Sequence, residues 1–292
     1  MRKLRKIKLL ATYGFFFVIF IISINKLQND FAQNYTKENF IYKFDKSYTK
    51  NGHRLAIVVP YRDRLEELNM FVPHMSKFLL SKNLDFKIFI VNQIDSYRFN
   101  RATLINIGFA LSKLENFDYL AMHDIDLLPL NQAINYSYPS PSEVLHLTPS
   151  GIHPRYNYPT FIGGILLISH ILYQQVNGMS NRYWGWGLED DEFYIRLKEK
   201  NIKVLNPQNI TTGKKTFLHN HDKNARPRDM RMSSKQYEIS KKRDHLTGLN
   251  NLPGLYTVVS RETLYVDKYP YEMIEVVLYC DEYKTPWCKS SS

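Results

Sequence analysis

The chain has 292 residues, of which 44% are hydrophobic and 14% are aromatic. It can bury one sizeable core, because single α/β domains of about 200 to 250 residues are common. The formal net charge is +11, and five of the positive charges lie among the first eight residues, which leaves +6 for the rest. That moderate basicity suits an anionic nucleotide or an acidic glycan as well as a nucleic acid.

The N-terminus departs from globular composition. The five basic residues precede an uncharged run from Leu9 to Ile24. As a helix this run would extend roughly 24 Å, close to the thickness of the thinner membranes of the early secretory pathway. We therefore predict a cytoplasmic tail over residues 1–8 and a transmembrane signal anchor over residues 9–25.

The residues that follow favour a retained anchor. No small-residue cleavage site is present over Asn25–Gln28. The basic tail keeps its end in the cytosol, so the rest of the chain is lumenal in a type II arrangement. We predict a polar stem over residues 26–52 and one folded lumenal domain over residues 53–292. A membrane anchor of this kind argues against nucleic acid as a partner.

The two cysteines and the glycosylation sequons fit that compartment. Cys280 and Cys288 are the only cysteines and lie eight positions apart. In an oxidising lumen they can close a small loop, so we predict a disulfide, the alternative being two unpaired thiols. Asn34, Asn135 and Asn209 begin Asn-x-Ser/Thr triplets, which are weak candidates for glycosylation because such triplets often arise by chance.

Apolar runs alternate with helical periodicities from His53 onward. Continuous apolar residues predict strands that are buried on both faces, and apolar residues at three- and four-residue spacing predict helices. Pro73 is expected to kink or divide the first helix. The order is strand, helix, strand, helix, strand over residues 55–59, 65–79, 86–91, 101–113 and 119–122. This predicts an α/β fold with a mostly parallel, Rossmann-like sheet that binds ligands beyond the carboxyl ends of its strands.

Two segments carry candidate metal ligands. Asp124 and Asp126 follow the third strand at i and i+2, so in extended backbone they share a face and favour a cation between them. His219 and His221 have the same spacing, and a site with two imidazoles and a carboxylate favours Mn²⁺ over Mg²⁺. Asp-x-Asp occurs often by chance, and the histidines can equally be surface residues.

The densest group of candidate residues is Trp184-Gly-Trp186-Gly-Leu-Glu-Asp190-Asp191-Glu192. Acidic residues in the first turn of a helix are favoured by its dipole, which explains part of the pattern. It does not explain the two tryptophans. Indole stacks on apolar sugar faces, and a neighbouring carboxylate can act as general base on a sugar hydroxyl.

Three further features lie beside these. Arg62 and Arg64 follow the first strand, where arginine can bind phosphate or simply begin a helix. Residues 161–168 are predicted to be a strand whose glycines allow a ligand to approach or mark a bulge. Tyr156 and Tyr158 precede it and can line a carbohydrate cleft.

In this order, the motifs strongly resemble the β-1,4-galactosyltransferase family. They are VPYRDR (59–64), FNRA (99–102), HDID (123–126), FIGG (161–164), WGWGLEDDEF (184–193) and HNHD (219–222). The HNHD form and the terminal Cys-x₅-Pro-Trp-Cys are most similar to the xylosylprotein branch, which adds galactose to xylose in the glycosaminoglycan linker. Tyr61 stands where the family usually has phenylalanine, and Pro159 where this branch tends to have a basic residue.

The resemblance implies a single GT-A domain on the Golgi membrane and an inverting transfer from UDP-galactose that requires Mn²⁺. By position, Asp190 would be the general base, assisted by Glu189. The metal ligands would be Asp126, His219 and His221. Residues of the donor nucleotide site would be Pro60, Tyr61, Arg62, Arg64, Phe99, Asn100, Arg101, Asp124 and Arg228. Residues of the sugar and acceptor site would be Trp186, Tyr156, Tyr158, Gly163, Gly164 and Asp191.

Alternatives remain open at this stage. The acceptor could be N-acetylglucosamine, or the donated sugar could be N-acetylgalactosamine. The chain could also be a membrane-anchored lectin without activity, or a metal-dependent phosphoesterase, since Asp-x-Asp and His-x-His suit hydrolysis too.

Overall fold

The computed structural model describes residues 52–210, 213–222, 224, 226–231, 233–242, 244 and 246–289. The predicted tail and anchor, the sequon at Asn34 and all of the predicted stem but Gly52 lie outside these residues. Among the described residues, no helix combines the length and apolar character needed to cross a bilayer.

The five predicted elements are present and alternate as expected. They are β1 (Arg54–Tyr61), α2 (Leu65–Ser81), β2 (Asp85–Gln93), α3 (Arg101–Leu114) and β3 (Tyr119–His123). β1 pairs in parallel with both β2 and β3. The predicted division of the first helix is wrong, because Pro73 lies inside one continuous α2. Proline removes the amide that would bond the carbonyl of Asn69, and Asn69 is exposed, so water can take that place.

The remaining elements complete the sheet and its cover. The strands are β4 (Leu127–Pro129), β5 (Glu143–His146), β6 (Ile165–Ser169), β7 (Lys203–Leu205), β8 (Phe217–His219), β9 (Tyr256–Val266) and β10 (Tyr269–Leu278). The helices are α4 (His170–Gln175), α5 (Glu189–Glu199) and α6 (Ser233–Lys242), with short 3₁₀ turns η2 (Leu249–Asn251) and η3 (Pro286–Cys288).

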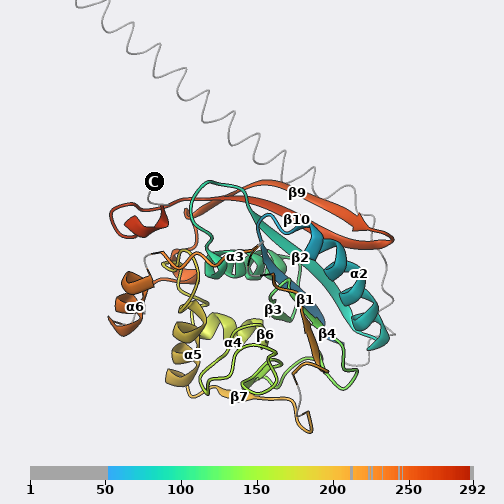
Figure 1. Ribbon diagram of the computed structural model, residues 1–292. Helices are drawn as coiled ribbons and strands as arrows, with labels where there is room; N and C mark the ends of the chain where they lie inside the picture. The colour runs from blue at the N-terminus through green and yellow to red at the C-terminus, as the bar shows by residue number, and fades with distance from the viewer. Residues whose placement is uncertain are drawn as a thin grey trace, which may run out of the picture. The chain divides into compact units, whose positions relative to one another are not determined.

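Eight strands form one twisted sheet in the order β7-β5-β6-β3-β1-β2-β10-β9, with the β9–β10 hairpin at one edge (Figure 1). β6 runs against β3 and β5, and β9 runs against β10, while the other pairings are parallel. All strands except β6 and β9 therefore share one direction. The predicted α/β class with a mostly parallel sheet is confirmed.

The alternation of side chains along the central strands creates two cores. On β1, Ala56 and Val58 pack with α3, α4 and α5, whereas Leu55, Ile57 and Val59 pack with α2. These side chains are fully buried, and each large one contributes roughly 1.5 to 3 kcal/mol from burial. The sheet is thus covered on both faces, which fixes its strand ends as the accessible place for a ligand.

The predicted strand over residues 161–168 begins later than expected, at Ile165. Gly164 has a left-handed φ of 80°, and a Cβ there would lie 2.5 Å from the Thr148 hydroxyl oxygen. The Gly163-Gly164 pair therefore forms a turn rather than a strand. Because β6 is antiparallel to β3, this turn lies beside the carboxyl end of β3, where Asp124 N donates to Gly164 O.

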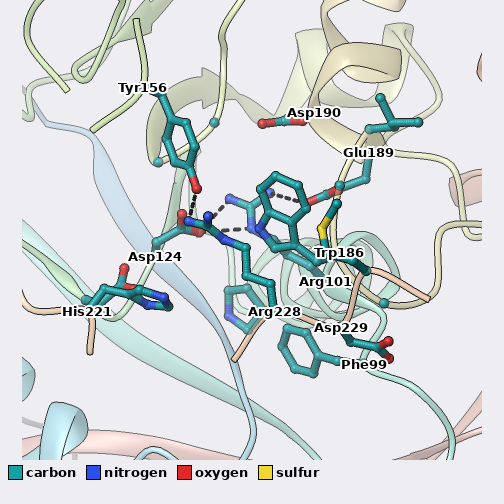
Figure 2. Close-up of a pocket in the computed structure, with 18 of the residues that line it drawn as sticks. Phe99, Arg101, Asp124, Tyr156, Trp186, Glu189, Asp190, His221, Arg228 and Asp229 are labelled. Carbon is teal, nitrogen blue, oxygen red and sulfur yellow. Dashed lines mark hydrogen bonds and ion pairs between the residues drawn. The ribbon is translucent and has the colours of Figure 1, made fainter. Parts of the chain in front are cut away.

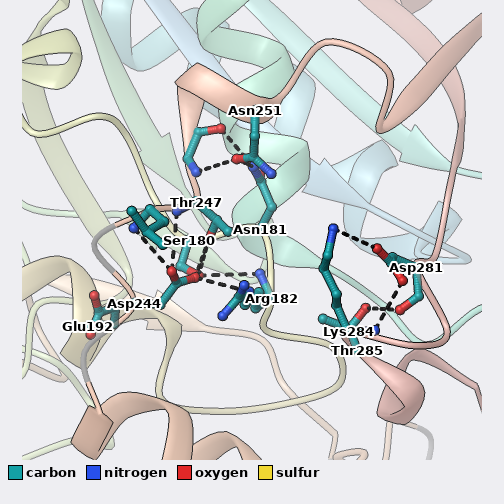
Figure 3. A network of polar contacts seen from close by, with 12 residues as sticks. Ser180, Asn181, Arg182, Glu192, Asp244, Thr247, Asn251, Asp281, Lys284 and Thr285 are labelled. Atoms are coloured by element: carbon teal, nitrogen blue, oxygen red, sulfur yellow. Dashed lines mark hydrogen bonds and ion pairs between the residues drawn. The ribbon is translucent and has the colours of Figure 1, made fainter.

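A buried polar network holds α5 in place (Figure 3). Arg196 donates to the carbonyls of Gly178, Asp244 and Thr247. The Asp244 carboxylate in turn accepts from Ser180 and pairs with the Arg182 guanidinium at 3.3 Å. Segments distant in sequence are thereby tied to the C-terminal half of the helix whose first turn carries the four acidic residues.

The predicted disulfide is confirmed. Cys280 and Cys288 are bonded, with their Cα atoms 6.2 Å apart. Inside the loop that they close, Asp281 accepts from the backbone of Lys284, and Thr285 donates to the carbonyl of Asp281 (Figure 3).

Candidate functional site

A pocket of about 690 Å³ opens where the carboxyl ends of β1 and β3 meet the amino ends of α3 and α5. Its position is the one expected for a ligand site in a largely parallel sheet. Figure 2 shows how its side chains converge from these elements. Every predicted site residue lines it except Tyr61 and Asn100: Pro60, Arg62, Arg64, Phe99, Arg101, Asp124, Asp126, Tyr156, Tyr158, Gly163, Gly164, Trp186, Glu189, Asp190, Asp191, His219, His221 and Arg228.

The two exceptions have structural positions. Tyr61 is 7% exposed and packs in the α2-side core, because it has the opposite parity to Pro60 along β1. Asn100 is fully buried and is the N-cap of α3, where its side chain accepts from Thr103 N and donates to Asn181 O. Neither residue lines the pocket, and the contact of both with the nucleotide stays a prediction.

A small two-stranded ribbon brings the metal candidates together. β4 pairs with β8 so that Leu127 lies opposite His219, and Asn220 N donates to Asp126 O at 2.8 Å. Ligand atoms of Asp126, His219 and His221 all lie within 4.8 Å of one another. The two imidazole rings are stacked, with centroids 5.7 Å apart. Residues nearly a hundred positions apart thus form one three-residue cluster.

The chemistry of this cluster fits Mn²⁺. Burial by itself would raise the pKa of Asp126, but hydrogen bonds to His219 and His221 outweigh it and hold that pKa below its ordinary value. The carboxylate is therefore ionised. His221 Nδ1 lies 3.1 Å from Asp126 Oδ2, and the buried Nε2 of the same ring has no hydrogen-bond partner among the residues that the structure describes. One carboxylate and two imidazoles form a borderline-hard donor set that manganese accepts more readily than magnesium does.

Arg101 joins the two acidic groups of the pocket. Its guanidinium lies 2.8 Å from Asp124 Oδ1 and 3.8 Å from Glu189 Oε1. Burial raises the pKa of both carboxyl groups, and the positive charge of Arg101 opposes that rise. Arg101 thus connects the turn after β3 with the first turn of α5 (Figure 2).

The acids of α5 enter the pocket from a tight turn. Leu188, at the N-cap, has a left-handed φ of 73°, which is uncommon for a residue with a Cβ. Burial, together with the charges of Glu189 and Asp191, raises the pKa of Asp190 to about 8. A carboxylate with its pKa near neutrality suits a general base.

Gly163 leaves the space that the Asp190 carboxylate uses. A Cβ on Gly163 would lie 2.5 Å from Asp190 Oδ2. The glycine therefore admits the carboxylate to the pocket floor.

One wall of the pocket is aromatic and cationic. Trp186 is 40% exposed at this wall, whereas Trp184 is 3% exposed and belongs to the core, so only Trp186 is available for stacking. The Arg228 guanidinium lies 4.6 Å from the centre of a Trp186 ring and hydrogen bonds to the Tyr156 hydroxyl. Tyr158 hydrogen bonds to Asp191 nearby.

The two arginines after β1 differ. Arg62 donates to the carbonyls of Gln93, Asp95 and Tyr97, so its donors mainly hold the loop between β2 and α3. Arg64 forms an ion pair with Glu67 at 3.2 Å.

Several pocket residues were not predicted. His153 packs edge-on against His219 and contacts Phe161 on its other side. Arg226 donates a hydrogen bond to the Glu67 carboxylate at the start of α2. The carbonyl of Asp229 accepts a hydrogen bond from Trp186 N. They occupy irregular segments without strand or helix periodicity, so only their closeness in sequence to the tyrosine and histidine motifs could have drawn attention to them.

Comparison with known proteins places the chain among glycosyltransferases. Residues 17–139 match the N-terminal region of glycosyl transferase group 7, and residues 143–222 match a domain described as the N-terminal domain of galactosyltransferase. The chain is 48% identical over 240 residues to β-1,4-galactosyltransferase 7 of Drosophila melanogaster, covering 82% of this chain and 74% of that protein. It is 45% identical over 242 residues to xylosylprotein 4-β-galactosyltransferase of Caenorhabditis elegans, covering 82% and 83%.

A solved structure agrees. It is a variant of the Drosophila β-1,4-galactosyltransferase 7 in complex with manganese, UDP-Gal and xylobiose. The TM-score is 0.78 at 47% identity, covering 82% of this chain and all of that one. The predicted GT-A-type domain is therefore confirmed.

Proposed function

The chain belongs to the β-1,4-galactosyltransferase family, and on that premise we propose that it transfers galactose from UDP-galactose to the 4-hydroxyl of xylose on proteoglycan core proteins. The observation that carries the proposal is that Asp190, Trp186 and the Asp126–His219–His221 cluster line one pocket. The Drosophila relative solved with manganese, UDP-Gal and xylobiose supports the same donor, metal and acceptor sugar.

On the donor side, the proposal gives each polar residue a task. Arg64 and Arg228 provide positive charge toward the diphosphate, and Phe99 provides an apolar surface near the nucleotide. Asp124, held by Arg101 at 2.8 Å, would accept hydrogen bonds from the ribose. Arg62 contributes mainly by fixing the loop that precedes Phe99.

Asp126, His219 and His221 would hold Mn²⁺. When bound there, the ion supplies positive charge against the negative charge that develops on the departing UDP. Hydrogen bonds to the two imidazoles lower the pKa of Asp126 and favour its ionised form, which is the form that binds a cation.

The transfer itself is an inverting displacement. The acceptor oxygen forms a bond to the anomeric carbon of galactose while the bond from that carbon to the UDP oxygen breaks. The proton of the acceptor hydroxyl passes to the Asp190 carboxylate, whose raised pKa strengthens it as a base. Glu189, paired with Arg101, positions the first turn of α5.

The acceptor would lie between aromatic residues. Trp186, Tyr156 and Tyr158 line the pocket with the Gly163-Gly164 turn, and Asp191 hydrogen bonds to Tyr158. Flat apolar faces of a sugar ring pack on such rings.

A transfer assay tests the proposal. Purified protein with UDP-galactose and a xyloside should yield a disaccharide, and chelation of Mn²⁺ should abolish the reaction. Transfer to N-acetylglucosamine but not to xylose would point to the other acceptor class. Sugar binding without any transfer would mean a lectin, and phosphate released from UDP would mean a phosphoesterase.

We also propose that the protein is a single-pass type II protein of the Golgi membrane, with residues 9–25 as anchor and the domain from residue 53 in the lumen. The charge distribution of the N-terminus supports this. Protection of the C-terminus from protease in sealed Golgi vesicles, lost on adding detergent, is expected. Digestion in sealed vesicles would contradict the topology.

A further inference from the structure

Arg98 lies directly behind the pocket rather than in it. The residue belongs to the loop between β2 and α3 and is 3% exposed. A guanidinium taken out of water is costly unless nearly all of its donors are matched. The partners of Arg98 therefore indicate what the charge is retained for.

Those partners come from two other parts of the chain. Nε donates to Asp229 Oδ2 at 2.7 Å, and Nη2 donates to the carbonyls of Asp229 and Arg231. Nη1 donates to Trp287 O at 2.9 Å, and the backbone amide of Arg98 donates to Cys288 O at 2.8 Å. One guanidinium thus joins the segment after the metal histidines to the disulfide-closed C-terminal loop.

The pocket wall rests against this charge. A Cβ on Gly185 would lie 1.9 Å from Arg98 Nη2, so the backbone of the Trp-Gly-Trp-Gly segment packs on the guanidinium. The carbonyl of Asp229 accepts from both Arg98 and Trp186 N. Trp186 stacks in turn against Arg228, which directly precedes Asp229 (Figure 2).

The C-terminal loop supports Arg98 from outside. Besides presenting two carbonyls to Arg98, it anchors itself through Trp287 Nε1, which donates to Arg182 O at 2.9 Å. Trp287 is 8% exposed. The Cys280–Cys288 bond closes the loop that holds these groups.

We propose that Arg98 is a positioning residue for the transfer reaction, which holds Trp186 and Arg228 in place from behind and couples them to the disulfide-closed C-terminal loop. The proposal rests on the galactosyltransferase function given above. It predicts that loosening Arg98 weakens sugar binding at this wall without disturbing the metal cluster, which lies on the β4–β8 ribbon.

Arginine is required by the geometry of the contacts. Its planar fork reaches the Asp229 carboxylate and three carbonyls at once, whereas lysine offers one ammonium group on a flexible stem. Arg98→Lys keeps the charge but loses most of these contacts.

The test compares Arg98→Lys with Arg54→Lys. Arg54 also joins separate segments, pairing with Asp85 and donating to Glu115 O, but at the opposite end of β1 from the pocket. For Arg98→Lys we expect the KM for a xyloside and for UDP-galactose to rise about tenfold with kcat little changed, the pattern of binding lost equally from the ground state and the transition state. Half-saturation by Mn²⁺ should stay at the wild-type value, as measured by both activity and binding of the free ion. Arg54→Lys should keep both KM values.

The outcomes are distinguishable. An inactive wild-type protein would reject the proposed function. An active wild type with unchanged KM values in Arg98→Lys, or an equal rise in Arg54→Lys at a matched loss of Tm, would overturn the positioning role.

Should Arg98→Lys fail to fold, Asp229→Asn provides the second variant. It keeps the shape and the carbonyl of Asp229 but removes the charge that Nε contacts. The same rise in KM, smaller in size, is expected, and unchanged KM values would overturn the proposal.

Discussion

At the scale of single residues, the surroundings of Asp190 support its proposed role as the general base. It follows Glu189 and precedes Asp191, and burial among these charges raises its pKa to about 8. Arg101 limits the accumulated negative charge by pairing with Glu189 and Asp124. Burial and the neighbouring carboxylates destabilise the ionised form of Asp190, and this makes its carboxylate a stronger base.

Replacing the base should abolish transfer and spare binding. Asp190→Asn keeps the size of the side chain, so UDP and Mn²⁺ should bind as in the wild type, while kcat falls by at least about 10²-fold. Calorimetric titration with UDP and single-turnover rates check the two halves. Turnover close to that of the wild type would remove Asp190 from the role of base.

Compared with the wild type, Asp190→Asn should become more stable as the pH rises. Between its ordinary pKa of 3.8 and the folded value of about 8, Asp190 keeps its proton in the folded protein but loses it in the unfolded chain. The folded state then binds more protons, so this carboxyl lowers the free energy of unfolding progressively toward pH 8. The Tm of Asp190→Asn minus that of the wild type should grow from pH 4 to pH 8. A flat or shrinking difference would contradict the raised pKa.

Removing a metal ligand should change metal dependence. His219→Ala and His221→Ala should each raise the Mn²⁺ concentration for half-maximal rate by at least about tenfold, since even indirect support of a metal ligand contributes that much. Manganese binding measured by electron paramagnetic resonance gives the same comparison without turnover. His53→Ala, at the start of the domain and stacked on Tyr138, is the control and should match the wild type. If the histidine variants also matched it, the ligand assignment would be wrong.

At the scale of elements, the site depends on where strands and helices begin and end. The carboxyl ends of β1 and β3 supply Pro60 and the aspartate turn, and the antiparallel β6 brings the Gly163-Gly164 turn against them. α5 begins at Glu189, so its first turn points into this space. The packing of one turn against another therefore sets the position of the base.

A methyl group at that contact tests the idea. In Gly163→Ala the new Cβ would meet Asp190 Oδ2 at 2.5 Å, and displacement of the carboxylate should lower kcat by up to about 10²-fold. Gly151→Ala is the control, because a Cβ there has open space, although its φ of 85° imposes backbone strain. Steady-state kinetics and Tm of both variants separate crowding from strain. A normal kcat in Gly163→Ala would show that the carboxylate position tolerates displacement.

At the scale of the whole molecule, the C-terminal segments close the structure. β10 pairs with β2, and the chain then returns through the disulfide loop to the back of the pocket. The C-terminal residues of the domain thus support a pocket whose earliest lining residue in the sequence is Pro60.

Removing the disulfide should weaken this closure. Cys280→Ser with Cys288→Ser opens a short loop, and the chain-entropy relation gives about 2 to 3 kcal/mol of lost stability. Urea unfolding should show a lower midpoint with the same slope. An unchanged midpoint would mean that packing of Trp287, rather than the covalent bond, holds the loop.

Local features of this protein could be predicted from its sequence. Apolar runs and helical spacing predicted the first three strands and two helices, because burial on two faces or one leaves a periodic trace. The acidic first turn of α5 was predictable from the helix dipole, and the place of Asp124 and Asp126 from the end of the third apolar run. The β9–β10 hairpin was missed, because its two-residue turn is Asp267-Lys268 and not the Asn-Gly or Asp-Gly pair that usually marks a hairpin in a sequence.

Long-range packing sets which of these parts meet. Asp126 and His221 are 95 positions apart and come together because β4 pairs with β8 in one register. Tyr61 points into the core and Pro60 faces the pocket. The reason is that α2 packs on one side of β1, and contacts distant along the chain set which side that is. Arg98 carried no periodic signal, since its role depends on carbonyls from residues up to 189 positions away. A periodic pattern in the sequence indicates how buried a residue is. The packing of helices and strands on one another sets which distant residues it contacts.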